Sequence, residues 1–304
     1  MPIQLIDSTE LLDSGDALRA RAAEDGYLFF RKLIPTDDIR AVRADVLRVV
    51  EQHGWLQPGQ DELGGLLRRE AYVTIPESDM RTDIGVTRAM YDAVQKLESV
   101  HRLPHHPTLL AFFERLFDKQ VLVHARHIAR MITSHPAMVP TPLHQDYPFI
   151  QGTSGTWTGW IPLGDCPRPM GGLTVLRASH HLGYVPVQTT RGAGGLAAQL
   201  CPTDPPDWAE IDYQAGDVLA FPAFTIHRAL PAVVKDQIRL SLDVRYQPID
   251  EAIEARSLKP HCGLTWEDIY AGWQRDDLKY YWQHIPLKIE GWDDSFMQPK
   301  KRIC

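Results

Sequence analysis

The chain has 304 residues, of which 44% are hydrophobic, so it is long enough to bury a large core. Its formal charge is −7, and the 32 Lys and Arg residues form no basic run. This composition argues against nucleic acid or an anionic membrane surface as the main partner. We therefore expect a small-molecule substrate.

The cysteines and the N-terminal segment predict a protein of a reducing compartment. Cys166, Cys201, Cys262 and Cys304 form no CxxC pair and lack the density of a disulfide scaffold, so no disulfide is expected. The N-terminus lacks a basic start followed by an apolar stretch, and no run approaches the length of a membrane span. We expect a soluble, cytoplasmic protein, with its oligomeric state left open.

The first part of the chain predicts a strand followed mainly by helices. Residues 26–34 are rich in aromatic and aliphatic side chains and predict a strand, and Pro35 and Thr36 break it and cap a helix that ends near Gly54. Residues 55–85 lack periodicity and predict a long irregular segment. Two further helices are expected near 86–101 and 107–118.

Strand patterns dominate from residue 121 to residue 250. The expected strands lie near 121–132, 157–163, 170–180, 211–221 and 238–246. Residues 188–207 are rich in Gly and Pro and predict a loop that can act as a lid. We expect one domain over 1–304, with N-terminal strand and helical support (1–118), a strand core (119–250) and a helical, aromatic C-terminal extension (251–304).

The last expected strand, 238–246, alternates without interruption. Arg239, Ser241, Asp243 and Arg245 face one way, and aliphatic side chains face the other. An arginine inside a strand core is costly unless it meets an anion. Either Asp243 or a bound ligand can satisfy Arg239, and Arg245 can fill the same ligand-binding role, so the sequence leaves these alternatives open.

One histidine stands out because an acid follows it two residues later. On an extended strand, His144 and Asp146 point to the same face and can bind one metal ion, which makes two thirds of a 2-His-1-carboxylate site. Composition alone gives about two such pairs by chance, and the simpler interpretation is a surface histidine beside a turn aspartate. For His124 and His127, we expect hydrogen-bonded structural roles.

Several motifs in a fixed order resemble the phytanoyl-CoA dioxygenase family of Fe(II)/2-oxoglutarate oxygenases. In chain order, these motifs are Asp25-Gly26-Tyr27, His144-Gln145-Asp146, Trp160, the segment from Gly172 to His180, Gly216-Asp217, His227 and Arg239-x-Ser241. The resemblance implies a mainly β fold with flanking α-helices and a double-stranded β-helix core of the jelly-roll or cupin-like kind. One departure is Ala178, because the family commonly has Gly before the Ser-His pair.

The resemblance also implies roles for individual residues. His144, Asp146 and His227 would bind Fe(II), and Arg239 and Ser241 would hold the distal carboxylate of 2-oxoglutarate. The remaining candidates are Gln145 and Trp160 for the cosubstrate cavity, and Tyr147, Phe149 and Arg126 for the substrate. Other arginines are scattered along the sequence and suggest no clamp for coenzyme A.

These residues predict a dioxygenase that uses O2 and 2-oxoglutarate to hydroxylate a C–H bond of a small organic molecule, releasing succinate and CO2. Halogenases of the family have a small residue in place of the metal carboxylate, and Asp146 is present here. Two alternatives stay open at this point. One is a cupin-like metal-dependent oxygenase that needs no 2-oxoglutarate, and the other is a non-catalytic binding protein built on the same jelly roll.

Overall fold

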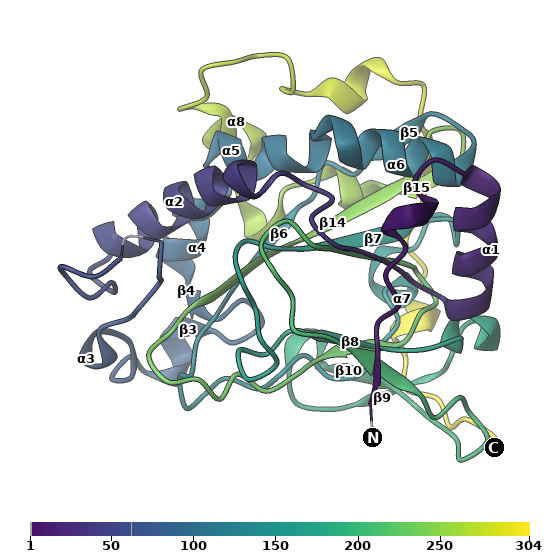
Figure 1. Ribbon diagram of the computed structural model, residues 1–304, viewed down its shortest axis with the longest axis horizontal. Helices are drawn as coiled ribbons and strands as arrows, with labels where there is room; N and C mark the ends of the chain where they lie inside the picture. Colours follow the sequence, from purple (N-terminus) through teal and green to yellow (C-terminus); the bar gives the residue numbers. More distant parts are fainter. Residues whose placement is uncertain (1, 62) are drawn as a thin grey trace.

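The computed structural model describes residues 2–61 and 63–304 and is built around two facing sheets (Figure 1). The larger sheet has the strand order β2-β12-β7-β14-β5, with β6 also paired to β14. Its strands are β2 (Leu28–Phe30), β5 (Val121–Val123), β6 (Ile128–Ile132), β7 (Trp157–Pro162), β12 (Val218–Pro222) and β14 (Arg239–Pro248). All of its pairings are antiparallel.

The smaller sheet has the order β1-β11-β8-β13 and closes the other side of the core. Its strands are β1 (Ile3–Gln4), β8 (Leu173–Leu176), β11 (Trp208–Glu210) and β13 (His227–Ala229). Three two-stranded sheets lie outside this pair: β3 (Met80–Arg81) with β4 (Val86–Thr87), β9 (Val187–Thr189) with β10 (Leu196–Ala198), and β15 (Ala252–Glu254) with β16 (Lys288–Glu290).

The longest strand, β14, confirms the alternation expected from the sequence. All ten of its residues are buried. Leu240, Leu242 and Val244 belong to the largest hydrophobic cluster, whereas Arg239, Asp243 and Arg245 line a small cavity between the sheets. Because β14 pairs with β7 on one side and with β5 and β6 on the other, it positions these polar side chains at the centre of the fold.

The strand expected over 121–132 is interrupted, which corrects the sequence interpretation. Val123 pairs with Tyr246, and Ile128 pairs with Asp243. The four residues between Val123 and Ile128 therefore lie opposite only two residues of β14. The His124 amide still donates to the Arg245 carbonyl at 2.8 Å, but the Arg126 amide donates to Ser257 instead. The bulge arises because the extra residues leave the ladder and turn towards the C-terminal extension.

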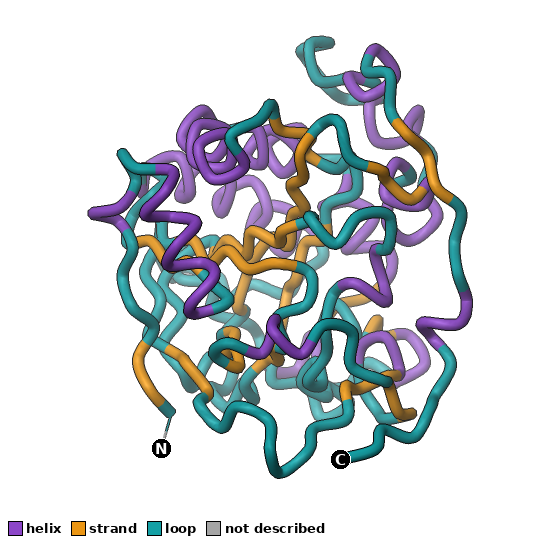
Figure 2. Tube along the Cα trace, turned by 90° about the vertical axis from the view of Figure 1, so that its right-hand side faces the viewer, coloured by secondary structure: helices purple, strands orange, loops and turns teal. Residues whose placement is uncertain are grey.

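Helices cover the outer face of the larger sheet (Figures 1 and 2). They are α1 (Gly15–Asp25), α2 (Thr36–Gln52), α4 (Arg88–Gln95), α5 (Glu98–Arg102) and α6 (Pro107–Phe117), with short helices α3 (Arg69–Tyr72), α7 (Tyr147–Ile150) and α8 (Trp266–Tyr270) elsewhere. Phe113 of α6 stacks on Tyr246 of β14 at a centroid distance of 4.0 Å. The helix expected over 86–101 is divided into α4 and α5.

A turn beside the core requires glycine. Gly26 ends α1 with a φ of 72°, and a Cβ there would lie 2.4 Å from His180 Nδ1. Its carbonyl accepts a hydrogen bond from Thr225 Oγ1 at 2.6 Å, and the neighbouring Asp25 carbonyl accepts one from the Ala178 amide. The Asp25-Gly26-Tyr27 motif therefore joins α1 to the segments that flank β8 and β13.

The segment 188–207 is more ordered than the expected loop and is attached to the C-terminus. It contains the β9–β10 hairpin, with Leu196 opposite Thr189. A disulfide joins Cys201 to Cys304, which corrects the prediction that the cysteines are unpaired. The two cysteines are 103 residues apart in the sequence, so their pairing could not be predicted from spacing. Only the path of the C-terminal extension brings Cys304 next to Cys201. The cytoplasmic location stays a prediction, and no described helix is long and apolar enough to cross a membrane.

Candidate metal centre and adjoining cavity

Three side chains converge between the two sheets. His144 forms an isolated bridge with His227, with 2.9 Å hydrogen bonds in both directions between their backbones. Asp146 has helical backbone angles and is the N-cap of α7. The regular strand expected at His144 and Asp146 is therefore replaced by a single β-bridge followed by a short helix. The ligand atoms of His144, Asp146 and His227 all lie within 4.8 Å of one another.

Backbone carbonyls orient both imidazoles. Nδ1 of His144 donates to the Pro142 carbonyl at 2.8 Å, and Nδ1 of His227 donates to the Thr225 carbonyl at 3.0 Å. A carbonyl only accepts, so each Nδ1 carries the proton and each Nε2 presents a lone pair. These two Nε2 atoms lie 3.7 and 3.9 Å from Asp146 Oδ1. Burial lowers the pKa of His227 to about 3, which keeps it neutral and able to bind a metal.

Asp146 is buried but stays ionised. Nη2 of Arg245 donates to both carboxylate oxygens, at 3.1 and 3.0 Å, and Thr158 Oγ1 donates to Oδ2. Burial alone raises the pKa of Asp146, but the Arg245 guanidinium outweighs it and holds the pKa well below its usual value. Arg245 therefore maintains the anionic form that a metal ligand needs.

This donor set fits Fe(II). Two neutral imidazoles and one carboxylate on one side of a divalent ion leave positions open for other ligands, as in non-haem iron oxygenases. The partners that orient these ligands are also in place, because each imidazole and the carboxylate has a hydrogen-bond partner on the side away from the others.

Arg239 lies in the same small cavity and differs sharply from Arg245. Its Nη1 donates to Ser241 Oγ, a neutral partner, at 2.6 Å. The Nε atoms of both arginines are buried without a hydrogen-bond partner, so the difference between them lies in the anion. Asp243, the protein acid considered as the partner of Arg239 from the sequence, instead accepts a hydrogen bond from Arg130 at 2.8 Å. Within residues 2–61 and 63–304, no carboxylate lies at ion-pair distance from the Arg239 guanidinium. A buried cation is thus held next to the triad without a protein anion.

The other expected site residues divide into two groups. Trp160 lines the small cavity with Arg239, and Phe149 and Arg126 line a larger cavity beside the triad. The side chain of Gln145 instead binds backbone atoms of Gly183, Val185 and Phe224, so the structure does not support its expected contact with a cosubstrate.

Tyr147 also lies away from the expected substrate position. Its ring packs against Phe224 and Phe296, at centroid distances of 4.8 and 5.2 Å. Gln151, at the end of α7, exchanges hydrogen bonds with Asp293 of the C-terminal extension. The extension therefore supports the helix that follows the triad, a role that the aromatic composition of residues 251–304 suggested only in general terms.

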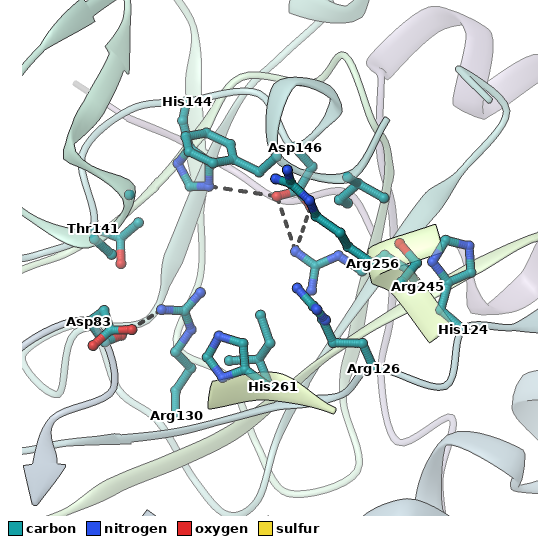
Figure 3. A pocket seen from close by; sticks show the side chains of 16 residues that line it. Asp83, His124, Arg126, Arg130, Thr141, His144, Asp146, Arg245, Arg256 and His261 are labelled. Carbon is teal, nitrogen blue, oxygen red and sulfur yellow. Dashed lines mark hydrogen bonds and ion pairs between the residues drawn. The ribbon is translucent and has the colours of Figure 1, made fainter. Parts of the chain in front are cut away.

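The larger cavity, of about 280 Å³, opens directly beside His144 and Asp146 (Figure 3). Its apolar lining comes mainly from Ile128, Phe149 and Ile150. Ala193 and Gly194, from the turn of the β9–β10 hairpin, line it as well, which places the segment predicted as a lid against the cavity. Several basic side chains complete the wall, and their sequence spacing gave no sign that they meet.

Comparisons with known proteins agree with this geometry. The family model for phytanoyl-CoA dioxygenase (PhyH) matches residues 22–239. A 1-deoxypentalenic acid 11-beta-hydroxylase from Streptomyces arenae is 29% identical over 266 residues, which cover 84% of this chain and 88% of that protein. The hydroxylase of the same name from Streptomyces exfoliatus is 28% identical over 269 residues, covering 84% and 89%.

Solved structures show the same fold. The epimerase SnoN, in complex with Fe³⁺, alpha ketoglutarate and nogalamycin RO, matches with a TM-score of 0.55 and 21% identity, covering 79% of this chain and 85% of that chain. The alpha ketoglutarate-dependent carbocyclase SnoK matches with a TM-score of 0.52 and 20% identity, covering 82% and 89%. The expected double-stranded β-helix with flanking helices is thereby confirmed.

Proposed function

Because the chain belongs to the phytanoyl-CoA dioxygenase family, and is therefore a non-haem iron and 2-oxoglutarate-dependent oxygenase, we propose that it hydroxylates a C–H bond of a small organic molecule. The overall reaction consumes the substrate, O2 and 2-oxoglutarate and yields the alcohol, succinate and CO2. The bound iron supplies the oxidising chemistry, and the protein supplies orientation and a water-poor cavity.

We assign the cofactor positions from the geometry of the two cavities. His144, Asp146 and His227 would hold Fe(II) through Nε2, a carboxylate oxygen and Nε2. Arg239 and Ser241 would bind the distal carboxylate of 2-oxoglutarate, while Trp160 closes the same cavity. The larger cavity would hold the substrate, with Phe149 in contact with it and His144 at its inner end.

The observation that carries the cosubstrate assignment is the unsatisfied state of Arg239. A buried guanidinium without an anion is costly, and it becomes favourable when a carboxylate binds through two charge-assisted hydrogen bonds. Arg245 is the competing candidate, but its Nη2 is already committed to Asp146. The larger cavity supports a substrate with an apolar part, since Ile128, Phe149 and Ile150 line one portion of its wall, while polar and charged side chains make up most of the rest.

An anaerobic titration of the Fe(II)-loaded protein with 2-oxoglutarate tests this proposal without knowledge of the substrate. A chelated 2-oxo acid gives a visible metal-to-ligand absorption band, which we expect to saturate in the wild type. Asp146→Ala should abolish the band, because a metal ligand is lost. Arg239→Ala should keep the band but require about 10-fold to 100-fold more 2-oxoglutarate, since a charge-assisted contact is removed.

Two outcomes would contradict the proposal. A wild-type protein that binds iron but gives no band would favour a cupin-like oxygenase that needs no 2-oxoglutarate. A band that is unchanged in Arg239→Ala would place the cosubstrate elsewhere. Product analysis then separates hydroxylation from other oxidations. The first compound to test is 1-deoxypentalenic acid, which the names of the Streptomyces relatives give. The expected product gains one oxygen atom from O2.

A further inference from the structure

A buried histidine of the larger cavity has one ring nitrogen that the protein leaves unpaired. His124 lies in the bulge between β5 and β6, where its amide donates to the Arg245 carbonyl. Its side chain is buried from bulk solvent but lines the cavity. In the view of Figure 3, His124 and His144 of the triad stand on opposite sides of this cavity. The two ring nitrogens of His124 therefore have different surroundings.

Gln247 determines which nitrogen of His124 carries the proton. Nε2 of Gln247 donates to the carbonyls of Glu251 and Ala252, at 3.1 and 3.2 Å. Because a carbonyl only accepts, the amide nitrogen of Gln247 faces these two groups and the amide oxygen faces His124. Nε2 of His124 lies 2.7 Å from this oxygen and must donate to it. The proton is therefore on Nε2.

The second nitrogen of the ring is an acceptor. Burial lowers the pKa of His124 to about 4, so the ring is neutral at neutral pH. A neutral imidazole with its proton on Nε2 carries a lone pair on Nδ1. Among residues 2–61 and 63–304, no donor reaches this Nδ1, and it is not one of the unpaired nitrogens that are sealed inside the protein. The lone pair is therefore open to the cavity.

His135 shows how the fold satisfies a histidine with a structural role. It is also buried, and its Nε2 donates to the Ile75 carbonyl at 3.0 Å. Its Nδ1 accepts a hydrogen bond from the Ala137 amide, also at 3.0 Å. The chain thus supplies partners for both nitrogens of His135. His124 has a partner for Nε2 alone, which explains only half of its hydrogen-bonding capacity as structural.

The other polar groups of the lining offer different chemistry. The arginine side chains only donate, and the hydroxyl groups of Thr141 and Ser257 can donate or accept. The carboxylates of Asp83 and Asp146 are already held by arginines. Nδ1 of His124 therefore adds to the cavity a neutral group that accepts a hydrogen bond but cannot donate one.

We propose that His124 binds the substrate by accepting a hydrogen bond from a substrate hydroxyl group. This inference rests on the proposed function and adds a functional group to its substrate. A substrate oxygen without a proton, as in a ketone, would place its lone pairs against that of Nδ1. An ammonium group would be repelled by the guanidinium groups of the same lining. The hydroxyl group would lie at His124, and the carbon to be oxidised would face the triad across the cavity (Figure 3).

A matched pair of probes tests the assignment. Adamantan-2-ol and adamantan-2-one share one apolar cage, and only the alcohol has a proton to donate. Their binding is measured by calorimetry on enzyme saturated with Fe(II) and 2-oxoglutarate, without O2 so that no turnover occurs. We expect the alcohol to bind at least about fivefold more tightly than the ketone, because it satisfies a buried acceptor that the ketone leaves unpaired.

A substitution at His124 then locates the preference. In His124→Gln, the side-chain amide can still donate to Gln247, but the acceptor at Nδ1 is lost, so the two probes should bind about equally. The matched control His135→Gln changes a buried histidine outside the larger cavity and should keep the preference. Saturation of the 2-oxoglutarate band shows that each variant is folded. Equal binding in the wild type, binding of neither probe, or a preference that persists in His124→Gln would each overturn the inference.

A substitution at Gln247 tests the position of the proton. Gln247→Met removes the oxygen that holds the proton on Nε2 of His124, so the proton can move to Nδ1. The ketone can then accept a hydrogen bond from Nδ1, and the alcohol preference should fall. A purely structural His124 predicts no such change. An unchanged preference in Gln247→Met would mean that Gln247 does not set the proton position, which removes the basis of the inference.

The two proposals fail separately. A normal 2-oxoglutarate band with no alcohol preference leaves the proposed function standing and removes only His124 as a substrate contact. Loss of the band in the wild type removes the proposed function, whatever the probes do.

Discussion

Arg239 and Arg245 lie on one face of β14 and line the same cavity, yet their surroundings differ. Arg245 donates to both oxygens of Asp146, whereas Arg239 contacts only the Ser241 hydroxyl in the hydrogen bonds described. Both are buried, with exposed fractions of 8% and 4%. One face of the strand therefore carries a cation that is paired with a carboxylate and, in the described residues, a cation that is not.

The two surroundings indicate different contributions of the two arginines to stability and to ligand binding. A buried ion pair that is broken on one side is strongly destabilising, because the remaining charge is left in a poorly solvating environment. A buried cation without an anion already bears that cost in the ligand-free protein and recovers it when an anion binds. We therefore assign Arg245 to the stability and ionisation of Asp146, and Arg239 to ligand binding.

The largest effect is expected for Arg245→Met, a variant of similar volume that leaves Asp146 buried without its cation. The free energy of unfolding should fall by about 3–5 kcal/mol, measured by urea denaturation. Iron affinity should also fall by about 10-fold to 100-fold, since the carboxylate loses a partner that orients it and keeps it ionised. Unchanged stability would show that the hydrogen bond from Thr158 suffices to hold Asp146.

The matched variant Arg239→Met should behave in the opposite way. It removes a buried cation that has no acid partner, so the free energy of unfolding should rise or change by less than about 1 kcal/mol. The concentration of 2-oxoglutarate needed for half-saturation should increase about 10-fold or more. A large loss of stability would mean that a protein anion supports Arg239 in solution, and the comparison between the two arginines would then fail.

The pH dependence of stability separates the two arginines further. The pKa of Asp146 is held below its ordinary value of 3.8, so its contribution is fully present above pH 3.8 and is lost as the pH falls through the lower folded-state pKa. The stability gap between wild type and Arg245→Met should therefore be largest near neutral pH and should shrink as the acid range is entered. The gap for Arg239→Met should vary less with pH, because no carboxylate accepts a hydrogen bond from Arg239 and Asp243 acts on it only at longer range.

The fold was predictable where the sequence pattern is periodic. The alternation of 238–246 and the helical spacing of 36–54 correspond to β14 and α2, because one face of each element packs into the core. The interruption at residues 124–127 was not predictable, since the bulge depends on contacts with a distant segment, Ser257 among them. The same reason explains the missed pairing of Cys201 with Cys304.

The site was predictable in its ligands but not in their support. His144 and Asp146 were found by spacing, and the resemblance added His227. Arg245 was considered only as an alternative to Arg239, because a one-dimensional pattern shows the face of a side chain but not its partner. The basic side of the larger cavity was predicted only at Arg126, since Arg126 and Arg256 come to line one cavity only after the C-terminal extension folds back beside β5 and β6.

The smallest effect tests the residue at which the sequence departs from its family. Ala178 has a φ of 59°, in the left-handed region that costs an L-residue about 1–2 kcal/mol and costs glycine little. Ala178→Gly should raise the free energy of unfolding by about 0.5–1 kcal/mol, after the greater flexibility of glycine in the unfolded chain is subtracted. It should leave the effects of Arg245→Met and Arg239→Met unchanged, since Ala178 contacts neither side chain.

The matched control Ala23→Gly, in helix α1, should instead lower the free energy of unfolding by about 1 kcal/mol. If both substitutions destabilise equally, the backbone at Ala178 is not strained, and the departure from the family's glycine carries no cost.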